Sequence, residues 1–129
     1  MVIDASTMVE ALVGQHPDAE LLDALTGEVD APHLLDVEVT SALRGLQLGG
    51  KLDPATAEQA LRDYLAFSIT RHEMPPFAER IWQMRHQYTS YDACYLALAE
   101  ALEVSLYTCD AKLAGTVHDA EVRVTPRTS

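Results

Sequence analysis

The apolar residues of this chain follow two patterns: short unbroken runs, and longer segments in which they recur every three or four positions. The short runs predict strands, and the spaced segments predict helices. Pro32 lies inside the second run, which predicts a strand near a sheet edge because proline cannot donate a ladder hydrogen bond. The predicted strands cover residues 1–3, 29–33, 69–72, 104–108 and 121–124.

Capping residues and glycines mark the ends of the predicted helices. Ser6 or Thr7 is the expected N-cap of the first helix, and Asp53 followed by proline opens the fourth. Gly14 and Gly49 follow the last apolar positions of two helices. The last predicted helix is apolar on nearly every side, which predicts packing on several faces. The predicted helices cover residues 6–14, 18–25, 34–48, 53–65, 75–88 and 93–102.

Strands that alternate with helices imply an open, mostly parallel sheet with helices on both faces. We therefore expect an α/β fold, a three-layer sandwich around a sheet of about five strands. The 129 residues show no repeat, low-complexity tract or linker, and the chain is long enough to bury a core. We expect a single domain over residues 1–129.

The charge balance argues against one class of nucleic-acid-binding protein. Lys and Arg number 9 against 20 Asp and Glu, and the net charge is −11. A protein that coats nucleic acid draws its affinity from many basic side chains spread along one face. The charge leaves open a local contact with nucleic acid through metal ions, and it predicts attraction to a basic partner.

The N-terminus and the cysteines favour a cytoplasmic protein. Asp4 interrupts the N-terminal apolar residues before a signal sequence can develop. The apolar run at residues 93–99 is far shorter than the ~20 residues that span a bilayer. Cys94 and Cys109 show no CxxC spacing, so we expect reduced cysteines that serve packing.

Four acidic residues stand at predicted junctions between strands and helices. Asp4 follows the first strand, Glu38 lies in the first turn of the helix after the second, and Asp110 follows the fourth. Asp92 opens the helix that leads into the fourth strand. Because loops at the carboxyl ends of parallel strands meet at one rim of the sheet, we expect these four acids in one cleft.

Two of these acids also have a purely local explanation. Thr89 fits a helix N-cap with Asp92 three positions later, where a negative charge suits the helix dipole. Asp110 fits the N-cap of a short helix at residues 111–114. Capping is the better explanation for either residue alone, and only the arrangement of all four acids favours a functional site.

Four carboxylates in one cleft predict a bound cation. Two carboxylates about 4 Å apart repel by roughly 4 kcal/mol at an effective dielectric constant of about 20. Such a group either takes up protons or holds a positive ion. Oxygen ligands without His or Cys select hard ions, Mg²⁺ or Mn²⁺, over zinc. A site of this kind suits hydrolysis of phosphodiesters, because the metal activates a water and neutralises charge on the phosphate.

The motifs that carry these acids resemble those of the PIN-domain ribonucleases. The matching segments are Asp4-Ala5-Ser6, Leu35-Asp36-Val37-Glu38, Tyr91-Asp92-Ala93 and Thr108-Cys109-Asp110. Each motif is weak alone, but four in this order are fairly specific, and the resemblance covers essentially the whole chain. The length of the chain and its start at Met1 are similar to those of VapC-type toxins from bacterial toxin–antitoxin pairs.

The resemblance implies a fold, an activity and partners. It implies a five-stranded parallel sheet and endonucleolytic cleavage of RNA that depends on Mg²⁺ or Mn²⁺. Relatives of this type are usually homodimers, and an antitoxin silences them by placing a basic tail in the acidic cleft. Some relatives carry a further acid shortly after the fourth, where Lys112 stands here, and this weakens the case for a second metal ion. The implied metal-binding and catalytic residues are Asp4, Glu38, Asp92 and Asp110, with Ser6 and Thr108 supporting them by hydrogen bonds.

Two cations and two aromatic residues near these motifs are less specific. Arg85 and Lys112 are placed to contact the scissile phosphate, although an ordinary surface ion pair is the better explanation for each. Phe77 and Trp82 have helical spacing with Ile81, which favours a place in the core or a dimer interface over stacking on bases.

The strongest alternative from another class is a phosphorylation-dependent receiver module of similar size and architecture. A receiver needs an acidic pair near Asp4, a phosphoacceptor Asp after the third strand and a Lys after the fifth. The chain has Ala5, His72-Glu73 and Pro126 at these places. A further alternative is a catalytically silent PIN scaffold that only binds a partner.

Overall fold

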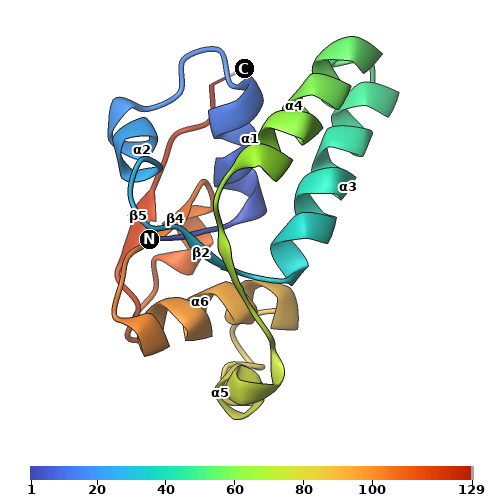
Figure 1. Ribbon diagram of the computed structural model, residues 1–129. Helices are drawn as coiled ribbons and strands as arrows, with labels where there is room; N and C mark the ends of the chain where they lie inside the picture. The colour runs from blue at the N-terminus through green and yellow to red at the C-terminus, as the bar shows by residue number, and fades with distance from the viewer. Residues whose placement is uncertain (129) are drawn as a thin grey trace.

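The computed structural model describes residues 1–128 and has an α/β fold in three layers (Figure 1). Its five-stranded sheet is parallel throughout, with the strand order β3-β2-β1-β4-β5. The three-layer α/β sandwich expected from the sequence is therefore confirmed. The strands are β1 (Val2–Ile3), β2 (Asp30–Pro32), β3 (Thr70–His72), β4 (Leu106–Thr108) and β5 (Val122–Val124).

Helices cover both faces of the sheet. They are α1 (Ala5–Val13), α2 (Ala19–Ala24), α3 (Leu34–Leu48), α4 (Pro54–Ala66), α5 (Ala78–Gln83) and α6 (Ser90–Leu102), with 3₁₀ turns η1 (Pro75–Phe77) and η2 (Ala111–Leu113). In Figure 1, α5 and α6 lie on one side of the sheet, and α1 lies on the other with the α3–α4 hairpin beside it. In the part of the chain that the structure describes, no helix is long and apolar enough to cross a membrane.

The observed helix starts confirm three predicted N-caps and correct a fourth. Asp110 caps η2, because its Oδ1 accepts from the Lys112 N–H at 2.9 Å. The side chains of Asp53 and Thr89 accept hydrogen bonds from the first turns of α4 and α6. The N-cap of α1 is Asp4, whose Oδ1 accepts from the Thr7 N–H at 3.0 Å, so the predicted cap at Ser6 or Thr7 is wrong. The physical reason is that α1 begins directly after Asp4, which places both predicted caps inside the helix.

The position of β2 also differs from the prediction, because this strand lies inside the sheet between β1 and β3. Asp30 N–H donates to Met1 O, and His33 N–H donates to His72 O on the opposite neighbour. Since successive N–H groups of a strand alternate in direction, the nitrogen of Pro32 faces the β1 side. In this register the Pro32 nitrogen faces the carbonyl of Ile3, the last residue of β1, so the proline ends the pairing of β1 with β2 at that rim of the sheet.

The helix predicted over residues 75–88 is two shorter elements, η1 and α5, and it ends at Gln83. Met84 N–H donates to Ile81 O, three residues back, which closes the last turn tightly. Met84 and Tyr88 therefore lie beyond the helix. Met84 is still buried in the core, so its apolar spacing reflects packing of a turn and not a continued helical face.

The core confirms that α6 packs on several sides. This helix lies between the sheet and α5, and it contacts β1, β2 and β4. Its buried residues include Ala93, Tyr95, Leu96, Ala97, Leu98 and Ala99. Each fully buried Leu contributes about 1.5–3 kcal/mol relative to an exposed one. This packing fixes the start of α6, and with it Asp92, against the sheet.

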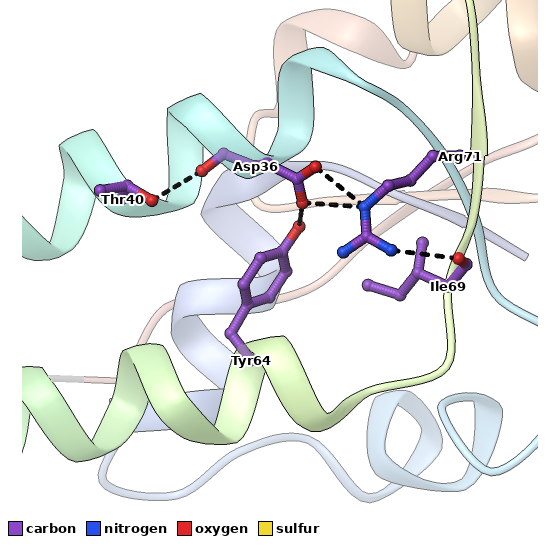
Figure 2. A network of polar contacts seen from close by, with 5 residues as sticks. All are labelled: Asp36, Thr40, Tyr64, Ile69 and Arg71. Carbon is purple, nitrogen blue, oxygen red and sulfur yellow. Dashed lines mark hydrogen bonds and ion pairs between the residues drawn. The ribbon is translucent and has the colours of Figure 1, made fainter.

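A polar contact ties the α3–α4 hairpin to β3 (Figure 2). Tyr64 Oη on α4 donates to Asp36 Oδ1 on α3 at 2.6 Å, and Arg71 Nε on β3 donates to both Asp36 oxygens at 3.0 and 2.9 Å. Arg71 also donates to the carbonyl of Ile69. The Tyr64 side chain is fully buried, whereas Asp36 and Arg71 keep partial contact with solvent.

Replacing Asp36 with alanine should lower the free energy of unfolding by about 1–3 kcal/mol, because the buried Tyr64 hydroxyl loses its acceptor. The hydrogen bond from Arg71 holds the pKa of Asp36 below its ordinary value of 3.8. The carboxylate's stabilisation is therefore complete above that value and is lost as pH falls through the lower folded-state pKa. Urea unfolding at neutral and acid pH should show a difference between the two proteins that shrinks in acid.

Glu58→Ala is the matched control for this substitution. Glu58 pairs with Arg62 on the exposed surface of α4, so its loss should change the free energy of unfolding by less than about 0.5 kcal/mol. Equal losses in the two variants would contradict a structural role for the Asp36 contact.

Candidate functional site

The strand order reverses between β1 and β4, and open α/β sheets form a ligand-binding crevice at the carboxyl ends of the strands at such a point. The chain runs from β1 outward to β2 and β3, then returns across the sheet to β4 and β5. The chain therefore leaves β1 towards one edge of the sheet and continues from β4 towards the other edge, so its direction reverses between these two strands. Asp4 directly follows β1, and Asp110 follows β4 after one intervening residue.

The carboxylate of Asp4 is held by hydrogen bonds at the carboxyl ends of β1 and β4. Its side chain is buried, with 8% of the residue exposed. Ser6 Oγ donates to Oδ1 at 2.7 Å, and the Thr7 N–H donates to the same oxygen at 3.0 Å. Thr108 Oγ1 at the end of β4 donates to Oδ2 at 2.5 Å. Two donors that follow β1 and one at the end of β4 therefore fix the orientation of the Asp4 carboxylate.

The same two hydroxyls position the loop that carries Asp110. Thr108 Oγ1 accepts from the Asp110 N–H at 3.0 Å, and Ser6 Oγ accepts from the Cys109 N–H at 3.0 Å. Because a backbone N–H can only donate, each hydroxyl must direct its own hydrogen to Asp4. The supporting contacts predicted for Ser6 and Thr108 are thus present in the structure.

Glu38 joins this group from α3. It lies in the second turn of the helix and not in the first, as predicted, because α3 already begins at Leu34 and Asp36 occupies the first turn. Tyr95 Oη on α6 donates to Glu38 Oε1 at 2.5 Å. Burial raises the pKa of Glu38, the charges of Asp4 and Asp92 raise it further, and the Tyr95 hydrogen bond opposes the rise.

Asp92 completes the group from the start of α6. Burial raises the pKa of Asp92, and the charges of Asp110 and Asp4 add to the rise. The hydrogen bond to Thr89 and the charge of Lys112 act in the opposite direction. The four predicted acids are thus close enough to influence one another, and they come from four different elements of the chain.

The donor set suits a hard divalent cation. Its four acids supply only carboxylate oxygens, and the raised pKa values of Glu38 and Asp92 mean that added positive charge would stabilise their ionised forms. As the side chains of residues 1–128 lie, no three His, Cys, Asp or Glu residues form a group that could hold a metal ion. Hydrogen bonds from Ser6, Thr108 and Tyr95 occupy carboxylate oxygens that a cation would share.

The two cations named from the sequence have different surroundings. Lys112 lies near the acids, because its charge acts on Asp92. The guanidinium of Arg85 stacks 4.6 Å from the centre of the Trp82 ring and donates to the Trp82 carbonyl. Among residues 1–128 it makes no ion pair, so the surface pair favoured for Arg85 is not observed. Trp82 is 67% exposed and is not part of the core. Phe77 is partly buried and packs against the core.

Sequence reasoning missed two side chains that shape this region. Tyr95 holds Glu38, but in the sequence it is one apolar residue among many in α6. Glu10 is 6% exposed, and its carboxylate accepts hydrogen bonds from the backbone and side chain of Thr128. An acid inside the apolar run from Met8 to Val13 was the available signal for Glu10.

Comparison with known proteins identifies the family. The model of the PIN domain matches residues 1–118. Ribonuclease VapC9 of Mycobacterium tuberculosis is 36% identical over 128 residues, covering 98% of this chain and 99% of that protein. Ribonuclease VapC1 of the same species is 44% identical over 117 residues, covering 88% and 87%. The crystal structure of PAE2754 from Pyrobaculum aerophilum superposes with a TM-score of 0.71 at 26% identity, covering 94% and 87%. The chain therefore belongs to the PIN-domain family.

Proposed function

We propose that this PIN-domain protein is a metal-dependent endoribonuclease and the toxin of a VapC-type toxin–antitoxin pair. The observation that carries the proposal is the meeting of Asp4, Glu38, Asp92 and Asp110 in the crevice between β1 and β4. Relatives that match nearly the full length are named ribonucleases. The receiver alternative lacks such support, because the chain has none of the three further residues that a receiver requires.

The four acids are the residues that would hold the metal, and we propose Mg²⁺ or Mn²⁺. When bound, the ion supplies a Lewis acid and a water of lowered pKa. Asp4 contributes a carboxylate whose direction is already fixed by Ser6, Thr7 and Thr108. This arrangement means that the first acid need not reorganise, which favours electrostatic stabilisation of a charged transition state.

Without a bound cation, the negative charges of Glu38 and Asp92 destabilise the folded protein. Their raised pKa values favour proton uptake, so binding of a cation is coupled to proton release from these two side chains. Tyr95 keeps Glu38 directed into the group through its short hydrogen bond. Lys112 and Arg85 are proposed contacts for the RNA phosphate, with Lys112 better placed because it lies near Asp92.

We also propose the partners that such a toxin requires. The net charge of −11 and the acidic crevice fit an antitoxin whose basic tail enters the site. A homodimer is proposed from the family resemblance, and a cytoplasmic location remains a prediction. A single PIN-like domain over residues 1–129 is supported by β5, which lies beyond the matched residues 1–118 yet pairs with β4 in the same sheet.

The purified protein should cleave RNA in the presence of Mg²⁺ or Mn²⁺, and cleavage should stop when EDTA is added. Asp92→Asn should slow cleavage by about 10²–10³-fold, the scale expected on losing one preorganised charge at the site. Gel analysis of a labelled RNA measures both rates. Asp23→Asn is the control, because it also removes one negative charge, but from the exposed part of α2. This variant should cleave at the wild-type rate. Full activity of Asp92→Asn, or binding of RNA without any cleavage by the wild type, would overturn the mechanism.

Divalent metal should raise the melting temperature, and the rise should depend on pH. Because the folded state raises the pKa of Glu38 and Asp92, it binds their protons more tightly than the unfolded chain, and the contribution of these two groups to the stability of the metal-free protein becomes more favourable as pH falls. Metal competes with those protons, so its stabilising effect should be largest near neutral pH and fade in acid. Thermal melts with Mg²⁺, Mn²⁺ or EDTA measure this dependence. A metal effect that is equal at all pH values would contradict it.

Thr108→Val should weaken metal binding or activity by about 10–100-fold, as expected when a group that orients a ligand is lost. Valine fills the same buried space but cannot donate to Asp4 or accept from the Asp110 N–H. Thr108→Ser keeps the hydroxyl and should retain most of the function. Calorimetric titration with Mn²⁺ and a cleavage assay distinguish the two variants, and equal losses in both would indicate a packing defect.

A further inference from the structure

A hollow of about 330 Å³ opens beside α1 and is not part of the acid group. It is bounded by α1, the end of α3, the turn into α4 and the C-terminal segment. Figure 1 shows this C-terminal segment returning to the end of α1. The polar residues of its lining that matter here are Ser6, Glu10, Lys51, Arg127 and Thr128.

One end of this hollow reaches the proposed active site. Ser6 lines the hollow and also donates its hydroxyl hydrogen to Asp4. The lining then follows α1 from Ser6 to Gly14, a distance of about 12 Å at 1.5 Å per residue. That length can accommodate more than one phosphate group of an extended strand. A strand that leaves the acids along α1 would therefore run through the hollow.

Lys51 and Arg127 give this hollow an uncommitted positive charge. Both side chains are exposed, and within residues 1–128 neither has a carboxylate at salt-bridge distance. Four other basic residues are neutralised in ion pairs, namely Arg62, Arg71, Arg80 and Arg123. With a net charge of −11, most of the surface repels a polyanion, so two free cations in one hollow matter for binding.

The C-terminal segment is fixed in place, which positions Arg127. Thr125 is buried and its N–H donates to Thr108 O at 2.7 Å. Thr128 donates from its backbone and its hydroxyl to the two oxygens of Glu10. These bonds hold the backbone on either side of Arg127, and its side chain is exposed. They also occupy both oxygens of Glu10, the one carboxylate that residues 1–128 contribute to the lining.

We propose that this hollow binds the sugar–phosphate backbone of the RNA substrate beside the cleavage site, with Lys51 and Arg127 each contacting a phosphate. The inference rests on the proposed ribonuclease function and adds a place for the strand outside the acid group. Phosphate contacts of this kind set the position of a nucleic acid without reading its sequence. The hollow therefore contributes affinity and register, and base selection lies elsewhere.

The proposal is tested by the salt dependence of RNA binding. The full-length protein is titrated, in EDTA to prevent cleavage, into a fluorescein-labelled single-stranded RNA of mixed sequence at several salt concentrations. Each lost phosphate contact should reduce the slope of log affinity against log salt by about 0.7. Lys51→Gln and Arg127→Gln should each show this reduction, and the double variant should show twice the effect. The acids repel RNA equally in all these proteins, so the comparison isolates the two cations.

Arg44→Gln is the matched control, because Arg44 is an exposed cation on α3 that forms no ion pair with the described part of the chain and lines a different hollow, between α3 and α4. It should keep the wild-type slope. A second variant, Gly14→Ala, tests the fixed C-terminal segment, since its Cβ would overlap both the carboxylate of Glu10 that holds Thr128 and the Glu10 carbonyl, so the end of α1 and the segment bound to it must shift. It should reduce the slope as Arg127→Gln does.

The outcomes separate this proposal from the proposed activity. If wild-type protein cleaves RNA with Mg²⁺ but Lys51→Gln and Arg127→Gln keep the full salt slope, the hollow is not a phosphate site and the ribonuclease function stands. A poly-glutamate peptide that binds the hollow while RNA does not would instead identify an acidic protein as its ligand and overturn the proposal. Reduced slopes in both variants, with Arg44→Gln unchanged, support it.

Discussion

The structure depends on one buried carboxylate, that of Asp4, held between the ends of two neighbouring strands. Hydroxyl groups from Ser6 and Thr108 donate to its oxygens and accept backbone N–H groups from the loop after β4. The ionised acid thus joins α1 to the loop that carries Asp110. A charge that is expensive to bury becomes the connection between the two halves of the crevice, because every bond it needs comes from the fold.

The remaining acids show the conflict between function and stability in this site. Burial and mutual repulsion raise the pKa of Glu38 and Asp92, so the metal-free fold gains nothing from their charge. Their positions are maintained by packing elsewhere: α6 is buried on nearly all sides, and the Asp36–Tyr64–Arg71 contact holds α3 to α4 and β3. The core therefore supplies the stability that the acids remove.

The sequence allowed the architecture and the acids to be predicted, since strand–helix alternation and the helix-start signals are local. It did not allow contacts between distant residues to be predicted. The pairing of Glu10 with Thr128 joins residues 118 positions apart, and the role of Tyr95 depends on α3 lying beside α6. The error at Pro32 has the same origin, because the place of β2 in the sheet depends on how strands distant in the sequence pair with one another. Such facts exist only once the chain has folded.

The central strand β1 has two residues, and Asp4 follows immediately. Side chains along an extended segment alternate between the two faces of a sheet, so their direction depends on whether a residue's number is odd or even. Adding or deleting one residue between Val2 and Asp4 would turn the acid towards the opposite face while leaving its identity unchanged. The distance along the chain from the sheet to its first acid is therefore as much a part of the site as the carboxylate itself, and relatives with shifted spacing there must rebuild the crevice by other means.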